Sequence, residues 1–300
     1  MHILITGGTG LIGRQLCKAL LAEGHELTVF SRNPASVRGK CGAAVHALAS
    51  LTEWQPGQAF DAVINLAGEP IVDKRWTAEY KQALWDSRVT LTGELVRRIA
   101  VAKHKPAILL SGSAVGYYGN RGDAVLDETA SAGKGFAAEL CSAWEDAARG
   151  AENSGVRVCL LRTAPVLSND GGMLRKMLPA FKLGLGARLG DGKQWMSWIH
   201  MADYVAMALG LLRDPHAAGP YNMAAPRPVT NAVFTATLAA VLHRPALFAA
   251  PAALLKLAMG ERASLLLEGQ RVLPMRMEAA HYRFAHPGLT DALHDLLEPG

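Results

Sequence analysis

A group of hydroxyl-bearing residues lies at the end of one predicted strand in this 300-residue chain. The apolar run 107–111 predicts the strand, and Ser113, Tyr117 and Tyr118 follow it in a glycine-rich segment. Serine and tyrosine hydroxyls in such a place can hydrogen-bond a carbonyl or an alcohol and relay a proton. We therefore predict Ser113 and Tyr117 as catalytic residues. The alternative is a glycine-rich turn in which the tyrosines only pack or cap.

A glycine cluster near the N-terminus is the second group with a chemical use. It follows the apolar run 2–6 and precedes a helical pattern. Gly8, Gly10 and Gly13 fit the spacing G-x-G-x-x-G, whereas Gly7, Gly10 and Gly13 fit G-x-x-G-x-x-G. Glycine lets a backbone turn approach a pyrophosphate, and the N–H groups at a helix start bind anions. This strand, turn and helix predict a dinucleotide site rather than a turn without a ligand.

The end of the second predicted strand, 27–30, indicates which dinucleotide is bound. A site for NAD usually has an acidic residue about 20 residues after the glycines, on the ribose hydroxyls. No acidic residue lies between Glu26 and Glu53, whereas Arg32 follows the strand directly. Because an arginine attracts the extra 2′-phosphate, we predict NADP(H). The alternative for Arg32 is a solvated surface side chain.

The pattern of elements predicts how these groups are positioned. Further apolar runs at 45–51, 61–68 and 156–161 predict strands, and the segments 77–102 and 133–154 predict helices, the first with Thr77 as its N-cap. Strands that alternate with helices favour a Rossmann-like α/β fold with a doubly wound parallel sheet, whose ligand lies beyond the carboxyl ends of the strands.

This fold predicts further residues of the cofactor site and a division of the chain. Leu66, Ala67, Gly68, Glu69 and Ser111 would line the cofactor, and Arg88 could reach a phosphate. We predict a Rossmann domain at 1–165, to which some later segments return, and a smaller substrate-side lobe at 166–300. Helices are expected in the later part at 201–213, 232–242, 252–259 and 289–297.

Composition excludes several classes of function. Half of the residues are hydrophobic, and the net charge of +5 comes from scattered basic residues, so neither disorder nor nucleic-acid binding is indicated. The four cysteines are far apart and predict buried thiols. The chain shows no apolar run of about 18 residues and no leader peptide, so we expect a soluble, cytoplasmic protein without a membrane segment.

The histidines do not predict a metal centre. His200 lies close to Asp203 and could form an acid/base pair with it. The chain contains neither H-x-x-x-H nor H-E-x-x-H, and His281 and His286 have no carboxylate at metal-ligand spacing. We therefore expect no metal.

Several longer strings resemble the extended short-chain dehydrogenase/reductase superfamily, in its NAD(P)-dependent epimerase/dehydratase group. They also resemble, more specifically, an atypical subgroup labelled only as epimerase family proteins. The strings are TGGTGLIG at 6–13, NLAGEPIVDKRWT at 65–77, SR at 87–88, LGDGKQWMSWIH at 189–200, and a C-terminal segment of unknown role from about Pro245.

The resemblance implies NADP(H) as the cofactor and a set of contacts to it. Those contacts are the pyrophosphate turn, the 2′-phosphate position, the strand end near the adenosine, one helix contact and a segment near the nicotinamide. Gly7, Gly10, Leu11, Ile12 and Gly13 match the pyrophosphate turn, and Ser31 and Arg32 match the 2′-phosphate position. Leu66 and Ala67 match the strand end near the adenosine, Arg88 matches the helix contact, and Pro165 matches the segment near the nicotinamide.

The catalytic set of the superfamily is incomplete here. It consists of Ser, Tyr and Lys, with the last two in Y-x-x-x-K, where the lysine favours the phenolate. The corresponding region reads GFAAELC at 135–141, and the chain has no Y-x-x-x-K. One hypothesis is therefore an oxidoreductase or a protein like the nucleotide-sugar epimerases, a monomer or homodimer, that acts on a small carbonyl or alcohol, sugar-like ones included. The other is a catalytically weak NADP(H)-binding sensor or regulatory protein.

Overall fold

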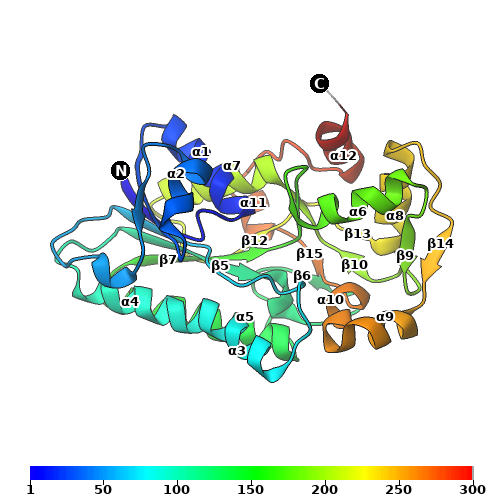
Figure 1. The fold of residues 1–300 in the computed structure, drawn as a ribbon, viewed down its shortest axis with the longest axis horizontal. Coiled ribbons are helices and arrows are strands. Elements are labelled where there is room, and N and C mark those ends of the chain that lie inside the picture. Colours follow the sequence, from blue (N-terminus) through cyan, green and yellow to red (C-terminus); the bar gives the residue numbers. More distant parts are fainter. Residues whose placement is uncertain (299–300) are drawn as a thin grey trace.

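A parallel β-sheet forms the centre of the computed structural model, which describes residues 1–298. The sheet has seven strands in the order β12-β7-β5-β4-β1-β2-β3, and every neighbouring pair is parallel (Figure 1). The strands are β1 (His2–Thr6), β2 (Glu26–Phe30), β3 (His46–Leu48), β4 (Ala62–Asn65), β5 (Ile108–Ala114), β7 (Arg157–Thr163) and β12 (Gly219–Met223). The prediction of a doubly wound α/β sheet is confirmed, although β3 is shorter than the run 45–51 suggested.

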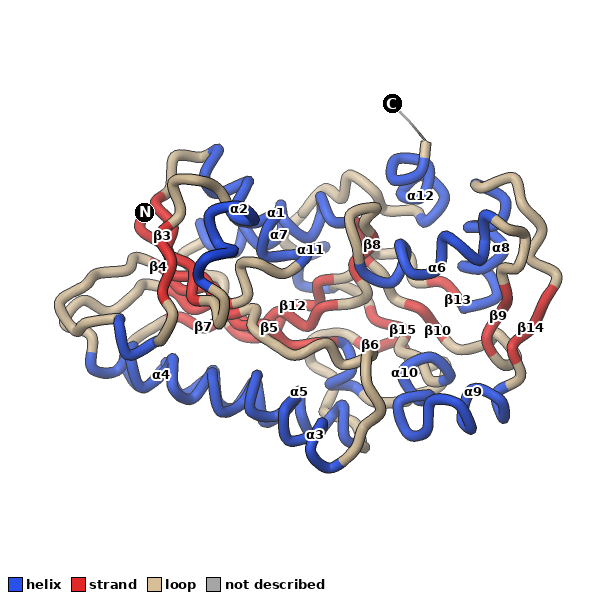
Figure 2. The backbone as a smooth tube through the Cα atoms, viewed as in Figure 1, coloured by secondary structure: helices blue, strands red, loops and turns tan. Residues whose placement is uncertain are grey.

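Helices cover both faces of this sheet. Figures 1 and 2 show α1, α2 and α7 on one side and α3, α4 and α5 on the other. The bounds are α1 (Leu11–Ala22), α2 (Val37–Cys41), α3 (Ala78–Trp85), α4 (Leu91–Val101), α5 (Phe136–Arg149) and α7 (Met201–Arg213). Ile3 and Ile5 of β1 belong to one core cluster, whereas Leu4 between them belongs to another. Because successive strand side chains point to opposite faces, each strand reads as a continuous apolar run.

The predicted helix 77–102 forms with one irregularity. Thr77 is its N-cap, and the Thr77 hydroxyl accepts the N–H of Tyr80 at 3.2 Å. A single π-helical segment, Asp86–Thr90, separates α3 from α4. Such a segment adds a residue to the turn and rotates the following side chains, and it is frequent at functional sites.

Much of the chain after β7 forms a smaller lobe, while α7 and β12 return to the main sheet. The lobe and its connections comprise α6 (Gly172–Lys182), β9 (Ala187–Leu189), β10 (Trp195–Met196), β13 (Val229–Thr230), α8 (Asn231–Val241), β14 (Phe248–Ala250), α9 (Ala252–Met259), α10 (Ser264–Leu267) and α12 (Leu289–Leu297). Two short strand pairs and one helix join the two parts: β8 (Val166–Leu167) pairs with β11 (Ile199–His200), β6 (Val125–Leu126) pairs with β15 (Arg271–Val272), and α11 (Met275–Ala279) packs on β12. The helices expected at 201–213, 252–259 and 289–297 have these bounds, and α8 lies one residue earlier than expected.

A separate core holds the lobe together. Trp198, Phe234 and Leu293 are fully buried in it, together with Leu174 and Phe181 of α6. These residues come from segments far apart in the sequence, so the lobe forms only when α6, α8 and α12 pack against one another.

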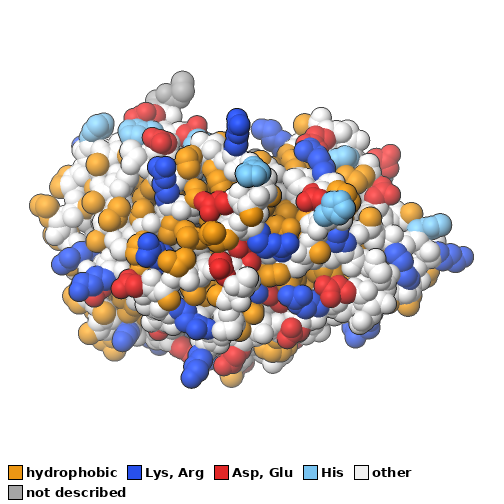
Figure 3. All heavy atoms as spheres, turned by 180° about the vertical axis from the view of Figure 1, so that it is seen from behind, with side chains coloured by type: hydrophobic (Ala, Val, Ile, Leu, Met, Phe, Trp, Pro, Cys, Tyr) orange, Lys and Arg blue, Asp and Glu red, His pale blue; other side chains and the backbone are white. Residues whose placement is uncertain are grey.

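The surface and the cysteines agree with the composition. On the face drawn in Figure 3, Lys and Arg side chains are interspersed with acidic and hydrophobic ones. All four cysteines are free and buried, as predicted. Burial raises the pKa of Cys141 to about 11, which keeps this thiol protonated at neutral pH. Within residues 1–298, no helix has the length and apolar character needed to cross a membrane.

Candidate functional site

The glycine cluster forms a tight turn between β1 and α1. Gly7 has φ +71°, and a Cβ atom on it would lie 2.6 Å from the carbonyl carbon of Leu66. A Cβ atom on Gly13 would lie 2.3 Å from the carbonyl oxygen of Gly7. The N–H of Gly10 donates to that oxygen at 3.0 Å and closes the turn. Backbone atoms therefore exclude a side chain at Gly7 and Gly13, and a Cβ atom on Gly8 would lie 2.9 Å from the side chain of Val29.

This turn presents a helix start at the carboxyl edge of the sheet. The first N–H groups of α1 belong to Leu11, Ile12 and Gly13, and the first turn of the helix has no acidic residue. N–H groups at this position lack acceptors within the helix and lie at the positive end of its dipole. The strand order also reverses here, since β2 lies on one side of β1 and β4 on the other. The arrangement suits a bound pyrophosphate.

A buried polar network supports the adjacent end of β4. The Thr6 hydroxyl donates to Oδ1 of Asn65 at 2.6 Å, and the N–H of Ala67 donates to the Thr6 hydroxyl at 3.2 Å. Nδ2 of Asn65 donates to the hydroxyls of Thr92 and Ser111 at 2.8 and 3.2 Å. Ser111 is fully buried, so its side chain orients Asn65 instead of lining the surface where we predicted it. The network positions the backbone of Leu66 and Ala67 against the glycine turn.

Arg32 and Glu69 meet across the end of β1. Arg32 follows β2 and its side chain is 80% exposed, whereas the side chain of Glu69 is 24% exposed. Nη1 of Arg32 lies 2.5 Å from Oε1 of Glu69. Ser31, next to Arg32, donates its N–H to Leu48 at 3.0 Å. The fold thus places an acidic group beside Arg32, which the spacing along β2 did not indicate, because Glu69 comes from the loop after β4.

Arg88 holds the loop that carries Glu69. It lies in the π-helical segment, and its Nη2 donates to the carbonyl of Glu69 at 2.8 Å. A Cβ atom on Gly68 would lie 2.8 Å from the guanidinium carbon, so the loop packs directly on Arg88. Burial lowers the pKa of Arg88. The predicted contact of Arg88 with a phosphate stays a prediction, since this guanidinium is bonded to the protein's own backbone.

Ser113 and Tyr117, the predicted catalytic pair, have different environments. Ser113 is buried at the end of β5, and its hydroxyl donates to Oε1 of Glu145 at 2.7 Å. Tyr117 is half-buried in the 3₁₀ turn Val115–Tyr118, and its ring lies 3.6 Å from the guanidinium carbon of Arg162. Tyr117 is therefore partly accessible, whereas the hydroxyl of Ser113 is buried and donates to a carboxylate.

Tyr118 is unsuited to proton transfer. Its side chain is fully buried, its hydroxyl donates to Oδ1 of Asn222 at 2.6 Å, and it accepts from Nη1 of Arg162 at 3.0 Å. Burial raises the pKa of Tyr118 to about 12 despite the nearby Arg162. Of the two tyrosines that the sequence suggested, the geometry favours Tyr117.

The sequence reasoning did not foresee an ion pair between Glu145 and Arg162. Nε and Nη2 of Arg162 donate to the two carboxylate oxygens of Glu145 at 2.8 and 2.9 Å, and both side chains are buried. Burial opposes the charge of Arg162, but the hydrogen bonds and charge of Glu145 outweigh it and raise the pKa of Arg162. A signal was present: Glu145 lies on the buried face of α5 with Ala138 and Cys141, and Arg162 ends an apolar strand. A charge in each of these places requires a partner.

The remaining predicted residue, Pro165, follows β7. It is exposed, and its carbonyl accepts the N–H of Ile199 at 3.1 Å. Apart from Arg88 in the π-helical segment, the predicted cofactor residues follow β1, β2, β4 and β7 or lie in β5, where Ser111 and Ser113 are in its second half. Because all these strands are parallel, their carboxyl ends meet at one edge of the sheet.

Asp203 has a different role from the acid/base pairing with His200 that the sequence suggested. Its carboxylate accepts the N–H groups of Ala285 and His286 at 2.8 and 2.9 Å and the hydroxyl of Tyr282 at 3.2 Å. It therefore anchors the segment before α12 to the start of α7.

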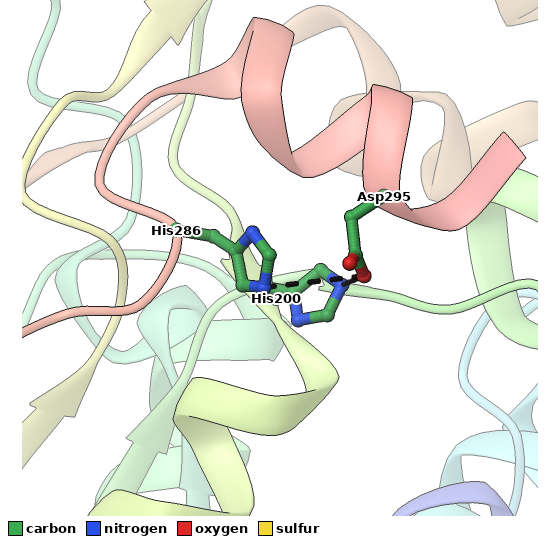
Figure 4. Close-up of side chains that lie close together, drawn as sticks. All are labelled: His200, His286 and Asp295. Atoms are coloured by element: carbon green, nitrogen blue, oxygen red, sulfur yellow. Dashed lines mark ion pairs between the residues drawn. The ribbon is translucent and has the colours of Figure 1, made fainter. Parts of the chain in front are cut away.

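His200 instead meets His286 and Asp295, which the spacing of the histidines did not indicate. Nε2 of His200 lies 3.2 Å, and Nε2 of His286 lies 3.9 Å, from the same carboxylate oxygen of Asp295 (Figure 4). These three groups lie close enough together to hold a metal ion. However, Nδ1 of His200 accepts the N–H of Ala202 at 3.1 Å, which implies that the proton of the neutral ring is on Nε2. The geometry therefore favours a polar contact between His200 and Asp295 over a metal centre, in which ligand histidines usually donate through their second nitrogen.

Comparisons with known proteins agree with this architecture. Residues 3–224 match the NAD dependent epimerase/dehydratase family, and residues 250–296 match a domain of unknown function, DUF1731. The epimerase family protein Mb2239 of Mycobacterium bovis is 44% identical over 295 residues, which are 97% of this chain and 96% of the relative. A chloroplastic SDR39U1 homologue of Arabidopsis thaliana is 38% identical over 99% of this chain and 87% of its own length.

Two solved structures are also similar. The human epimerase family protein SDR39U1, crystallised with NADPH, superposes with a TM-score of 0.90 at 34% identity and covers 100% of both chains. A nucleoside-diphosphate sugar epimerase from Corynebacterium glutamicum superposes with a TM-score of 0.77 at 30% identity, over 99% of this chain and 58% of that one.

Proposed function

The chain belongs to the NAD-dependent epimerase/dehydratase family, and from this premise we propose that it binds NADP(H) and acts as an oxidoreductase on a small carbonyl or alcohol, sugar-like ones included. The glycine turn carries the proposal, because Gly7 and Gly13 have no room for a side chain and α1 starts directly beyond them. A similar protein, human SDR39U1, was crystallised with NADPH.

Arg32 supports NADP(H) as the cofactor. Its exposed guanidinium lies at the end of β2, where the adenosine ribose lies in dinucleotide folds. A guanidinium binds phosphate through charge-assisted hydrogen bonds. In this proposal Arg32 and Ser31 bind the 2′-phosphate, and the start of α1 binds the pyrophosphate.

Tyr117 is the proton donor in the proposed reaction. The nicotinamide, when bound, supplies or accepts the hydride. The half-buried Tyr117 follows β5 at the same sheet edge as the glycine turn and can give a proton to the substrate oxygen. Ser113 would hydrogen-bond that oxygen after its hydroxyl rotates away from Glu145.

Calorimetric titration tests the cofactor. NADPH, NADP⁺, NADH and NAD⁺ are titrated into the wild-type protein, Arg32→Ala and Arg97→Ala, the last as a control on the exposed surface of α4. We expect NADPH to bind more tightly than NADH, and Arg32→Ala to weaken NADPH by about 10-fold, since a charged hydrogen bond contributes ~1.5 kcal/mol or more. Arg97→Ala should change neither affinity. Absence of nucleotide binding would refute the proposal.

The reaction is tested with Tyr117→Phe. Loss of a general acid typically costs about 10²–10⁴-fold in rate. We expect this loss in NADPH-dependent turnover of a carbonyl library, with NADPH affinity unchanged. Equal turnover in wild type and variant would remove Tyr117 from the mechanism.

A second candidate function is a sensor or regulatory protein with weak catalysis. It is favoured by the missing Y-x-x-x-K, by the hydrogen bond that the Ser113 hydroxyl donates to Glu145 and by the buried Tyr118. A protein partner captured with NADPH but not with NADP⁺ would support it, and capture that ignores the nucleotide would count against it.

We also propose a cytoplasmic location and a monomeric or homodimeric state. The location is tested by cell fractionation, since the Arabidopsis relative is named chloroplastic. The state is tested by light scattering of the purified protein.

A further inference from the structure

We propose that Glu69 restrains the preference of this site for NADP(H), because it holds Arg32 in an ion pair that the 2′-phosphate must displace. This inference rests on the proposed function, since it takes Arg32 as the residue that binds the 2′-phosphate.

The two partners of the ion pair differ in freedom. The backbone of Glu69 is held on both sides: its N–H donates to the Ser87 hydroxyl at 3.0 Å, and its carbonyl accepts from Arg88 at 2.8 Å. The side chain of Arg32 is 80% exposed, and Glu69 is its one ion-pair partner among residues 1–298. When the pair opens, Arg32 moves to a ligand while Glu69 stays at the site.

The carboxylate of Glu69 has opposite effects on the binding of NADP(H) and NAD(H). Oε1 of Glu69 lies 2.5 Å from Nη1 of Arg32. A 2′-phosphate that binds Arg32 therefore lies close to the Glu69 carboxylate, and because like charges repel, the carboxylate weakens the binding of NADP(H). NAD(H) has a neutral 2′-hydroxyl there, which can donate to a carboxylate, as it does to the acidic residue of many NAD sites. Glu69 thus provides from the loop after β4 the group that is absent after β2.

Removing the charge of Glu69 while keeping its shape should therefore increase selectivity. In Glu69→Gln the backbone contacts to Ser87 and Arg88 are retained, so the loop stays in place. Arg32 is then free to meet the phosphate. Since an exposed ion pair contributes only a few-fold to an equilibrium, we expect NADPH to bind about 5-fold more tightly and NADH not to bind more tightly.

Asp73→Asn provides a matched control. Asp73 lies in the same loop and pairs through Oδ1 with Nζ of Lys176 at 2.5 Å, with both side chains exposed. This variant removes the same charge without touching Arg32. We expect less than about 2-fold change in either affinity, which separates a specific contact from a general change in net charge.

The experiment measures NADPH and NADH affinities of wild type, Glu69→Gln, Asp73→Asn, Arg32→Ala and the double variant Arg32→Ala/Glu69→Gln by calorimetry. The inference predicts a higher NADPH to NADH affinity ratio in Glu69→Gln, and no such gain when Arg32 is absent. An unchanged ratio overturns it, and weaker NADPH binding by Glu69→Gln would show instead that Glu69 positions Arg32. A wild-type protein that binds no NADPH refutes the proposed function itself, whereas wild-type binding that depends on Arg32 but not on Glu69 refutes only this inference.

Discussion

Replacing Glu145 with glutamine is expected to destabilise the fold strongly. Glu145 accepts two hydrogen bonds from Arg162 and one from Ser113, and both members of the ion pair are only 2% exposed. Glutamine keeps the shape but removes the charge, so the Arg162 guanidinium remains buried without a counter-charge. Breaking a buried pair in this way costs about 3–5 kcal/mol. Because glutamine still offers one oxygen, we expect ~3 kcal/mol, a large part of the roughly 5–15 kcal/mol that stabilises a typical domain.

Thermal and urea denaturation of the purified variant measure this effect. A loss of ~3 kcal/mol corresponds to a decrease in Tm of about 5 °C for a chain of 300 residues. Glu152→Gln is the control, because the Arg149–Glu152 pair is 3.9 Å long and its side chains are 40% and 50% exposed. Such a pair contributes about 0.5 kcal/mol or less.

Two results would contradict this reasoning. The first is equal stability of Glu145→Gln and Glu152→Gln. This result would mean that a buried arginine needs its opposite charge no more than an exposed arginine does. The second comes from the double variant Glu145→Leu/Arg162→Met. Removing both charges should cost less than removing one, so a double variant less stable than Glu145→Gln would show that the cost is one of packing.

Two further predictions concern the glycine turn and the histidine cluster. Gly13→Ala should abolish NADPH binding in calorimetry, because the new Cβ would lie 2.3 Å from the Gly7 carbonyl oxygen. The control is Gly93→Ala in α4, where the new Cβ would meet no atom of another element within 4 Å, so this variant should retain binding and be more stable by about 0.5–1 kcal/mol. Retained NADPH binding by Gly13→Ala would refute the tight turn. Burial, and then the charge of His286, lower the pKa of His200 below 6.5. As the pH decreases, the unfolded state therefore binds the proton before the folded state does. The free energy of unfolding should decrease below about pH 6.5, by at most ~1.4 kcal/mol per pH unit. His200→Gln should show a flatter dependence of Tm between pH 7 and 5, and parallel wild-type and variant curves would exclude His200 as the titrating group.

Local patterns in the sequence predicted most strands of the central sheet, but not its edge strand β12. The apolar runs predict β1, β2, β4, β5 and β7 because these strands are buried on both faces and are apolar over much of their length. The glycine spacing also predicts the turn. The requirement at Gly13 comes from backbone atoms of the turn itself, whereas the requirement at Gly7 comes from Leu66, which the sheet brings close. Both signals are local patterns that can be read in one sequence, although the contacts that they reflect are partly tertiary.

The candidate site could be predicted only in part. The sequence indicated that Arg32 and Glu69 lie near the cofactor, and it did not indicate that they touch. Ser113 and Tyr117 looked equivalent as hydroxyl groups, and the structure separates them: the Ser113 hydroxyl donates a hydrogen bond to Glu145 and is buried, whereas Tyr117 is half-buried.

The sequence by itself determined the order of the elements, the position of the phosphate turn and the absence of an acidic residue after β2. The tertiary structure alone decided which charged groups meet: Arg32 with Glu69, Arg162 with Glu145, and His200 with His286 and Asp295. The partners in these contacts are separated by 17 to 95 residues. Strand order and helix packing bring these charged residues together. A local periodicity in the sequence does not indicate which distant residues become neighbours.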